Sequence, residues 1–398
     1  MTVKNVPASE LSDRLARFTA EMDCAYDDWE LCAITGYVSL YYLTGTICDG
    51  VMLIRRGGGA VLWVRKSYER ALLESEFSDI RPMSGFRDVA AGSGALQDTI
   101  YLDTACATLE WYGMLSKYMP FKHVMPVDKV MLKTRAIKSE YELERMRFAG
   151  STVDRLLRNE LPSMLREGIS EAQLGTALFS LYMENGYQGI NRFSMRSGEM
   201  LLGHVSFGDS PLYPSVFDGA SGVAGLCPAV PVLGRRDRYL REGDLIFVDT
   251  AFGYDGYHID KTMVFSYKKE QPQHVAAAHR HCLGLERQAA AMLNAGVKPS
   301  DIYNEVAGSV DPAFRDSFMG VPGRTVKFMG HGVGLYTDEL PVIAKGFDDP
   351  LEYGMTIALE PKIGVAGAGM VGNENTYLVT AEGGVCITGG PADIILCK

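Results

Sequence analysis

The sequence predicts an α/β domain at the amino terminus, followed by a larger domain of mixed helices and strands that carries a metal centre. Three observations support this prediction. The chain has 398 residues, enough for two or three domains with sizeable cores. Short apolar segments alternate with helical segments up to about residue 130. Five acidic or imidazole side chains lie at or near the ends of apolar segments in the last third of the chain.

The composition is that of an ordinary globular protein, with 47% hydrophobic and 22% charged residues. A formal net charge of −10 argues against binding to nucleic acid or an anionic membrane, since both need clustered Lys and Arg. The sequence contains no apolar run of about 18 residues, so we expect no transmembrane helix. The first residues lack the apolar core of a secretory signal. The eight cysteines include no C-x-x-C pair, so we expect reduced thiols in a cytoplasmic protein.

The first domain is expected to span residues 1–132. Apolar strands are predicted at 50–56, 59–64 and 98–103, with a helix over 67–77. The segment 128–135 is the predicted joint, and residues 133–398 form the second domain.

Two capping boxes predict helix starts in the second domain. Ser139 and Glu142 form one, and Ser170 and Gln173 repeat it before another helix. Residues 208–235 are rich in Gly and Pro and are predicted to form a loop beside the active site.

A third helix is predicted over 271–292. His274, His279 and His281 lie in it without the i, i+4 spacing of a ligand pair, so we assign them to a polar helix face.

Two of the five candidate metal ligands, Asp249 and Asp260, lie in the segment 244–265, where two apolar runs flank a glycine-bracketed turn. We predict a hairpin centred on residues 254–255, in which Asp249 faces Asp260 directly. Cross-strand partners lie roughly 4.5–5.5 Å apart, and like charges at that separation are destabilising. Two such carboxylates suppress each other's ionisation unless a cation neutralises them, so the pair predicts a metal site.

The other three candidates fit the same interpretation. Glu360 closes an apolar stretch, and Glu374 follows fourteen residues later, before another. His331 lies in GHGVGL, whose glycines allow a close approach to a crowded centre. In both EGDLIFVD and YGMTIALE an acid follows a glycine by six residues. Two related halves would place four carboxylates around one centre. Any single acid could instead be a solvated strand-end residue, but the full set favours a metal site.

On the motifs VDTAFGYDGYHIDKT, GHGVGL, ALEP and NEN, the chain resembles the pita-bread metallopeptidase family. That family includes methionine aminopeptidase, aminopeptidase P and prolidase, and the non-peptidase relatives creatinase and dimethylsulfoniopropionate lyase. Residues 41–45 and 135–150 resemble segments of the prolidase and creatinase branch. The resemblance implies a creatinase-type α/β domain followed by an α+β pita-bread (creatinase/aminopeptidase-like) catalytic domain.

The resemblance also implies two divalent ions, drawn from Mn, Co, Fe or Zn. Asp260 and Glu374 would bridge them, Asp249 would complete one, and His331 with Glu360 the other. Glu360 or Glu374 would accept the proton when water attacks a carbonyl. The implied activity is hydrolysis of a small peptide or amide, of the Xaa-Pro dipeptidase or aminopeptidase type, by a homodimer.

Two departures from the family pattern open an alternative. Family peptidases generally carry two further histidines near the metals. No histidine occurs between His204 and His258, so the upstream position is empty, and the downstream position holds Asp338. Asp338 could be a general base or a solvated loop acid. As a base, beside Glu339, it resembles the acid pair of dimethylsulfoniopropionate lyase, so the alternative is a metal-dependent lyase.

Other residues give weaker indications. Arg192 and Arg196 could clamp a substrate carboxylate bidentately, although surface arginines are commoner than clamps. His204 and His258 could approach the site, but we expect His258 to pack on the sheet. A binding module without catalysis is a third possibility, and the complete ligand set argues against it.

Overall fold

The computed structural model describes residues 5–94, 97–194 and 198–398 and divides into two compact units, Met1–Arg135 and Ala136–Lys398. The division falls within the last helix of the first unit, α6 (Asp128–Ala136), near the predicted joint. Nothing in the described residues forms a helix long and apolar enough to cross a membrane.

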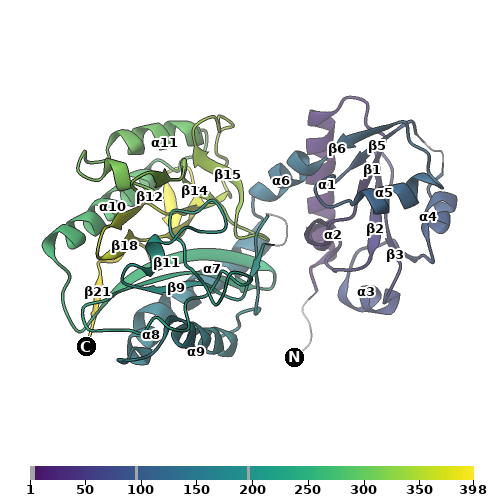
Figure 1. Ribbon diagram of the computed structural model, residues 1–398. Helices are drawn as coiled ribbons and strands as arrows, with labels where there is room; N and C mark the ends of the chain where they lie inside the picture. The colour runs from purple at the N-terminus through teal and green to yellow at the C-terminus, as the bar shows by residue number, and fades with distance from the viewer. Residues whose placement is uncertain (1–4, 95–96, 195–197) are drawn as a thin grey trace. The chain divides into compact units, whose positions relative to one another are not determined.

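The first unit is an α/β domain (Figure 1). Its six-stranded sheet has the order β4-β3-β2-β1-β5-β6 and mixes parallel and antiparallel pairs. The strands are β1 (Leu31–Ile34), β2 (Gly50–Arg55), β3 (Ala60–Val64), β4 (Ile80–Pro82), β5 (Thr99–Leu102) and β6 (His123–Pro126). The helices before α6 are α1 (Ala8–Ala25), α2 (Tyr37–Thr44), α3 (Tyr68–Glu74), α4 (Phe86–Gly92) and α5 (Leu109–Ser116). The three predicted strands and the predicted helix are confirmed as β2, β3, β5 and α3.

The helices of the second unit begin where the capping boxes predict. Ser139 Oγ accepts from the Glu142 amide at 3.3 Å, and Glu142 Oε2 accepts from the Ser139 amide at 2.9 Å. The same reciprocal pair joins Ser170 and Gln173. The helices are α7 (Glu140–Arg155), α8 (Leu161–Met164), α9 (Glu171–Glu184), α10 (Gln273–Ala291) and α11 (Pro299–Gly308), with a π-helical turn at Leu156–Glu160.

Three sheets carry the candidate ligands or their neighbours. The first has the order β21-β11-β10-β9, the second β15-β14-β16-β19-β20, and the third β13-β12-β17-β18. The strands of the first two are β9 (Gly203–Phe207), β10 (Leu245–Tyr254), β11 (Tyr257–Tyr267), β14 (Phe328–Gly332), β15 (Glu339–Ala344), β16 (Thr356–Leu359), β19 (Asn375–Val379), β20 (Gly384–Cys386) and β21 (Ile395–Cys397). The third sheet contains β12 (Gly320–Val321), β13 (Arg324–Thr325), β17 (Lys362–Val365) and β18 (Gly369–Gly372), and a short pair is formed by β7 (Asn191–Arg192) and β8 (Glu199–Met200).

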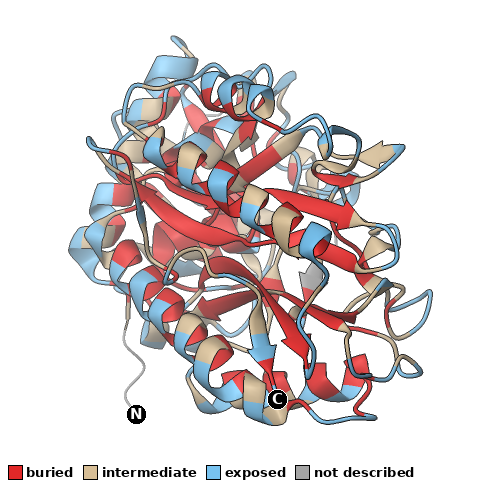
Figure 2. Ribbon diagram, turned by 90° about the vertical axis from the view of Figure 1, so that its left-hand side faces the viewer, coloured by how far each residue is buried: buried red, intermediate tan, exposed pale blue. Residues whose placement is uncertain are grey.

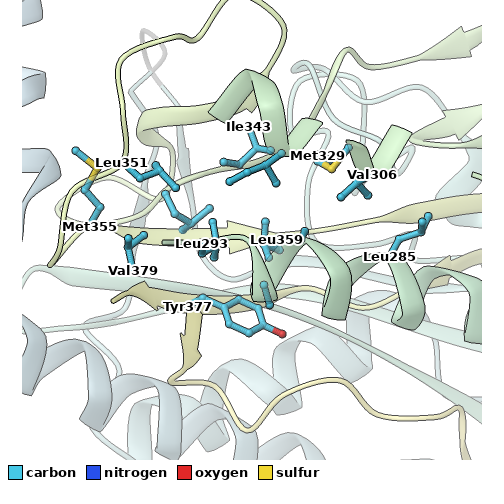
Figure 3. Packing of buried hydrophobic residues seen from close by; sticks show 14 of the residues in the cluster. Leu285, Leu293, Val306, Met329, Ile343, Leu351, Met355, Leu359, Tyr377 and Val379 are labelled. Atoms are coloured by element: carbon cyan, nitrogen blue, oxygen red, sulfur yellow. The ribbon is translucent and has the colours of Figure 1, made fainter. Parts of the chain in front are cut away.

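The main core of this unit lies between the second sheet and the helices α10 and α11. Leu285 and Leu293 come from the α10 region, and Val306 from α11, and they pack with Ile343 and Leu359 of the strands (Figure 3). Strands of this unit are buried along most of their length, whereas its helices are buried on one face and exposed on the other (Figure 2). This packing holds the strands that carry or adjoin the acids in fixed positions: Asp249 and Asp260 lie within β10 and β11, and Glu360 and Glu374 lie next to β16 and β19.

The assignment of all three α10 histidines to a polar face is wrong for His279. Its side chain is 1% exposed, Nε2 lies 2.9 Å from the Ala392 carbonyl oxygen, and Nδ1 accepts from the Gly372 amide at 3.2 Å. His279 therefore ties α10 to β18, next to the segment that carries Glu374.

Candidate metal centre

The β10–β11 hairpin carries Asp249 and Asp260 on one face, but not directly opposite each other. Asp249 pairs with Thr262, so Asp260 is its diagonal neighbour. The turn residues Asp255 and Gly256 both have positive φ, 48° and 94°, as a type I′ turn requires. Because Asp-Gly favours that turn, the hairpin is centred one residue later than predicted. The predicted face-to-face pairing is therefore wrong, but the side-chain period of two keeps both acids on the same face.

Three of the five candidates converge closely. One ligand atom each of Asp260, His331 and Glu374 lie within 4.8 Å of one another. They come from β11, from β14 and from the residue that precedes β19. His331 Nε2 also lies 3.7 Å from Oε1 of both Glu360 and Glu374. The group fits a divalent cation, because carboxylates with one imidazole suit Mn, Fe, Co or Zn.

The glycines beside His331 allow this convergence, as the sequence predicts. A Cβ on Gly332 would lie 2.2 Å from the Leu340 carbonyl oxygen, and one on Gly330 would lie 2.4 Å from that of Ala358. Both contacts are far too short for a real side chain, so the strands beside β14 can approach only because these positions are glycine.

Lys362, which the sequence analysis did not consider, reaches the other side of the same acids. Its Nζ donates to Asp249 Oδ2 at 3.1 Å, to Glu360 Oε2 at 2.8 Å and to Glu374 Oε2 at 2.8 Å. A signal for this contact exists in the sequence. Lys362 follows Glu360 by two residues, and residues i and i+2 of an extended segment share one face.

Both carboxylate oxygens of Asp249 accept hydrogen bonds from protein groups. Its Oδ2 accepts from Lys362 and from the Ser221 hydroxyl at 2.9 Å, and its Oδ1 accepts from the Thr262 hydroxyl at 2.9 Å. Ser221 belongs to residues 208–235, the segment predicted to form a loop beside the active site, and this segment does reach the site. Asp249 does not fit the ion that the resemblance assigns to it in this arrangement, because the Lys362 ammonium lies between its Oδ2 and the Oε2 atoms of Glu360 and Glu374.

Burial and mutual repulsion shift the proton affinities of these acids. Burial, followed by the charges of Glu374 and Asp249, raises the pKa of Asp260 well above its usual range. Burial likewise raises the pKa of Glu374 to about 7. For Asp249 burial is again the largest influence and acts in the same direction, but Lys362, His204 and the hydrogen bond from Thr262 together outweigh it, so the pKa is lowered. For Lys362 burial opposes the charge, and the three carboxylates hold the pKa well above its usual range.

His204, one of the two histidines considered as able to approach the site, lies beside Asp249. His204 in β9 pairs with Asp249 in the sheet register and is 3% exposed. Its ring stacks on Phe217 with centroids 5.5 Å apart, and its Nε2 has no hydrogen-bond partner among the described residues. Burial lowers the pKa of His204, which favours the neutral ring.

His258 packs against the sheet, as predicted. It is 0% exposed, with Nδ1 3.0 Å from the Gly334 carbonyl oxygen and Nε2 2.9 Å from Gln188 Nε2. Burial lowers its pKa to about 4. The ring therefore links β11 to the GHGVGL segment as a neutral group.

Asp338 lies against the segment that carries Arg192 and Ser194. Ser194 donates to Asp338 twice, from its amide to Oδ1 at 2.6 Å and from its hydroxyl to Oδ2 at 2.9 Å. The Arg192 carbonyl oxygen accepts from the Thr337 amide at 2.7 Å, so the same two segments are joined again beside Asp338. These contacts favour the loop role of Asp338 over the base role. Arg196 lies outside the described residues.

Known proteins resemble both units. Residues 144–381 match Metallopeptidase family M24, and residues 14–137 match the Creatinase/Prolidase N-terminal domain. The probable dipeptidase PepE of Mycobacterium tuberculosis (strain ATCC 25618 / H37Rv) is 28% identical over 70% of this chain and 68% of its own. The putative dipeptidase YkvY of Bacillus subtilis is 27% identical over 71% of this chain and 70% of its own.

Solved structures share the fold. Dipeptidase PepE from Mycobacterium ulcerans superposes with a TM-score of 0.80 at 21% identity, covering 99% of this chain and 100% of its own. The Xaa-Pro dipeptidase from Bacillus anthracis superposes with a TM-score of 0.79 at 21% identity, covering 97% of this chain and 99% of its own. These likenesses confirm the predicted pita-bread fold and creatinase-type first domain. None of these four relatives supports the lyase alternative. The chain is a member of metallopeptidase family M24, and so of a family of hydrolases.

Proposed function

We propose that this chain is a metal-dependent peptidase that cleaves small peptides at Xaa-Pro bonds, as a dipeptidase or an aminopeptidase. The observation that carries the proposal is the convergence of Asp260, His331 and Glu374 in a chain of this family. The names of relatives support the substrate class, since they include dipeptidases and an Xaa-Pro dipeptidase.

Asp260, His331 and Glu374 would hold a divalent cation of Mn, Co, Fe or Zn. When bound, such a cation supplies Lewis acidity and lowers the pKa of a water molecule. Glu360 is the proposed proton acceptor. Its Oε2 is bound by Lys362 at 2.8 Å, which orients Oε1 toward the His331 side of the centre. The resemblance implies two ions, but the position of Lys362 argues for one.

Substrate contacts are assigned to Arg192 and Arg196 as the carboxylate clamp. His204 is proposed to replace the missing upstream histidine, because its unpaired, buried Nε2 belongs to the residue paired with Asp249. Asp338 is proposed to hold the loop around Ser194 in place beside Arg192, so that it positions the clamp rather than taking a proton.

A cytoplasmic homodimer remains the proposed state. The eight cysteines are free thiols, as expected in a reducing compartment. Size-exclusion chromatography with light scattering tests the dimer.

The direct test is an assay of Xaa-Pro dipeptides and Xaa-Pro tripeptides with added Mn or Co, with Xaa-Ala peptides as the comparison. The matched inactive control is Asp260→Asn, which removes one ligand charge at nearly constant volume. Selective release of the residue before proline supports the proposal. Absence of Xaa-Pro turnover by metal-loaded protein, with acrylate formed from a sulfonium acid, would favour the lyase.

A further inference from the structure

The Lys362 ammonium makes a saturated set of contacts with three of the candidate ligands. An ammonium group has three donors, and Lys362 presents them to Asp249, Glu360 and Glu374 at 2.8–3.1 Å. Each carboxylate supplies one oxygen. The result is a cation inside a cage of three acids, built from the chain itself.

A divalent ion cannot share this position. An ion bound through the same three oxygens would lie roughly 2.0–2.2 Å from each of them, in the space that Nζ now fills. With the ammonium in place, the ion would also bring a second positive charge against Nζ in a buried site, where such repulsion is strong. The ammonium and the ion are therefore alternatives at this position.

Lys362 is not free to move away. Its side chain is 2% exposed, and its backbone is held in the β17–β18 register opposite Gly372. Nζ also lies 5.8 Å from the centroid of the Phe247 ring. Withdrawing the lysine would leave three carboxylates buried beside each other without a counter-charge, at a high cost in free energy.

The two glutamates use different oxygens for the two sides of the centre. The Oε2 atoms of Glu360 and Glu374 bind Lys362, whereas their Oε1 atoms each lie 3.7 Å from His331 Nε2. The Lys362 side is thus closed, and the His331 side, together with Asp260, keeps a donor set for one ion.

The charge balance agrees with this division. Asp249, Asp260, Glu360 and Glu374 carry four negative charges when ionised. One divalent ion and one ammonium supply three positive charges, whereas two ions and the ammonium would supply five. With one ion the buried centre keeps a single negative charge, which suits a group that must accept a proton.

We propose that Lys362 permanently replaces one of the two cations of this centre, so that the protein binds a single divalent ion between Asp260, His331 and Glu374. This inference rests on the proposed metal centre, but not on the identity of the substrate. Lys362 also becomes a positioning residue, because it fixes the orientation of Glu360.

The test is the stoichiometry of Mn²⁺ on the full-length chain after chelation and dialysis. Elemental analysis and calorimetric titration are expected to give one ion per chain, and the Mn²⁺ electron paramagnetic resonance spectrum is expected to be the six-line pattern of an isolated ion. Two tightly bound ions per chain with an exchange-coupled spectrum would overturn the inference.

Variants identify the responsible residue. Lys362→Ala opens space and removes the charge, so it should raise the stoichiometry from one to two. Lys362→Met removes the charge but keeps the bulk of the side chain, so the stoichiometry should remain at one ion per chain. Lys298→Met is the control, since that exposed lysine precedes α11, in a segment that carries none of the candidate ligands. A folded Lys362→Ala protein that still binds one ion would contradict the assignment. If that variant does not fold, the wild-type stoichiometry and spectrum decide.

Failure of the inference is separable from failure of the proposed function. One ion with no peptide turnover contradicts the proposed substrate and leaves the assignment of Lys362 intact. Two ions with Xaa-Pro turnover contradict the assignment of Lys362 alone. No bound ion at all contradicts both.

Discussion

Glu360 Oε2 accepts a hydrogen bond at 2.8 Å from the ammonium of Lys362, two residues further along the chain. Pro361 lies between them, and β17 begins at Lys362. One short segment therefore supplies both a proposed proton acceptor and the cation that orients it. Removing the Lys362 ammonium is expected to disturb Glu360, since it would leave Glu360 Oε2 buried without the donor that it has in the folded protein.

Replacing Glu286 with Gln should remove a pH-dependent part of the stability. Glu286 is 0% exposed, Asn375 and Tyr377 donate to its Oε1, and burial raises its pKa to about 7. The folded state thus holds a proton up to about pH 7, and the unfolded state only below about pH 4.3. This stabilisation is complete below pH 4.3 and is lost as the pH rises through 7.

Urea unfolding of chelated protein at pH 5 and pH 8 checks this prediction. Between the two values the wild type should lose on the order of 2–3 kcal/mol more than Glu286→Gln. A stability difference between the two proteins that does not change with pH would show that the carboxyl stays ionised.

Gly332→Ala should damage the metal centre through the backbone. The new Cβ would lie 2.2 Å from the Leu340 carbonyl oxygen, so β14 and β15 must separate and His331 must shift. We expect a loss of about 1–3 kcal/mol in the free energy of unfolding, with weaker Mn²⁺ binding in calorimetry. The control is Gly284→Ala in α10, where a Cβ meets nothing within 4 Å and should stabilise the helix by about 1 kcal/mol. Unchanged Mn²⁺ affinity in Gly332→Ala would show that the strands adjust without moving the ligand.

The pair Asp338→Asn and Ser194→Ala distinguishes a loop anchor from a base. Ser194 donates to both oxygens of Asp338, so both variants should loosen the same loop. We expect similar losses of kcat/KM, roughly 10-fold, with a rise in KM as the main part. Loss of nearly all kcat in Asp338→Asn, with normal kcat in Ser194→Ala, would instead assign the base role to Asp338.

His204→Phe tests the proposed replacement for the missing histidine. Phenylalanine keeps the stacking on Phe217 but removes the unpaired nitrogen. The Mn²⁺ content should be unchanged, while kcat/KM should fall roughly 10–100-fold, as expected for one lost hydrogen bond to a charged group. The packing control is Phe217→Leu, which keeps the imidazole. Full activity of His204→Phe would reduce His204 to a core residue.

Features encoded by neighbouring residues could be predicted from the sequence. The capping boxes at Ser139 and Ser170 depend on residues three positions apart, and both form as expected. The close approach at His331 follows from its flanking glycines. The existence of the hairpin is confirmed, but its predicted register is wrong, because the turn preference of Asp255 and Gly256 decides the centre.

Features that depend on contacts between distant segments could not be predicted. His204 and Asp249 meet only because β9 pairs with β10 across a long connection. Ser221 reaches Asp249 from within that connection. Lys362 is different, because it lies close to Glu360 in the sequence. A search for metal ligands considers acids and imidazoles, and so it passes over a cationic side chain that can substitute for a metal.

The contacts of Lys362 bear on how this protein folds before any metal is bound. Without a counter-charge, the mutual repulsion of several buried carboxylates would oppose folding of the pocket that they line. Here the neutralising group is translated together with the acids, so the newly made chain can reach its final shape under metal starvation. We expect the ion to load afterwards, into a site that is already assembled.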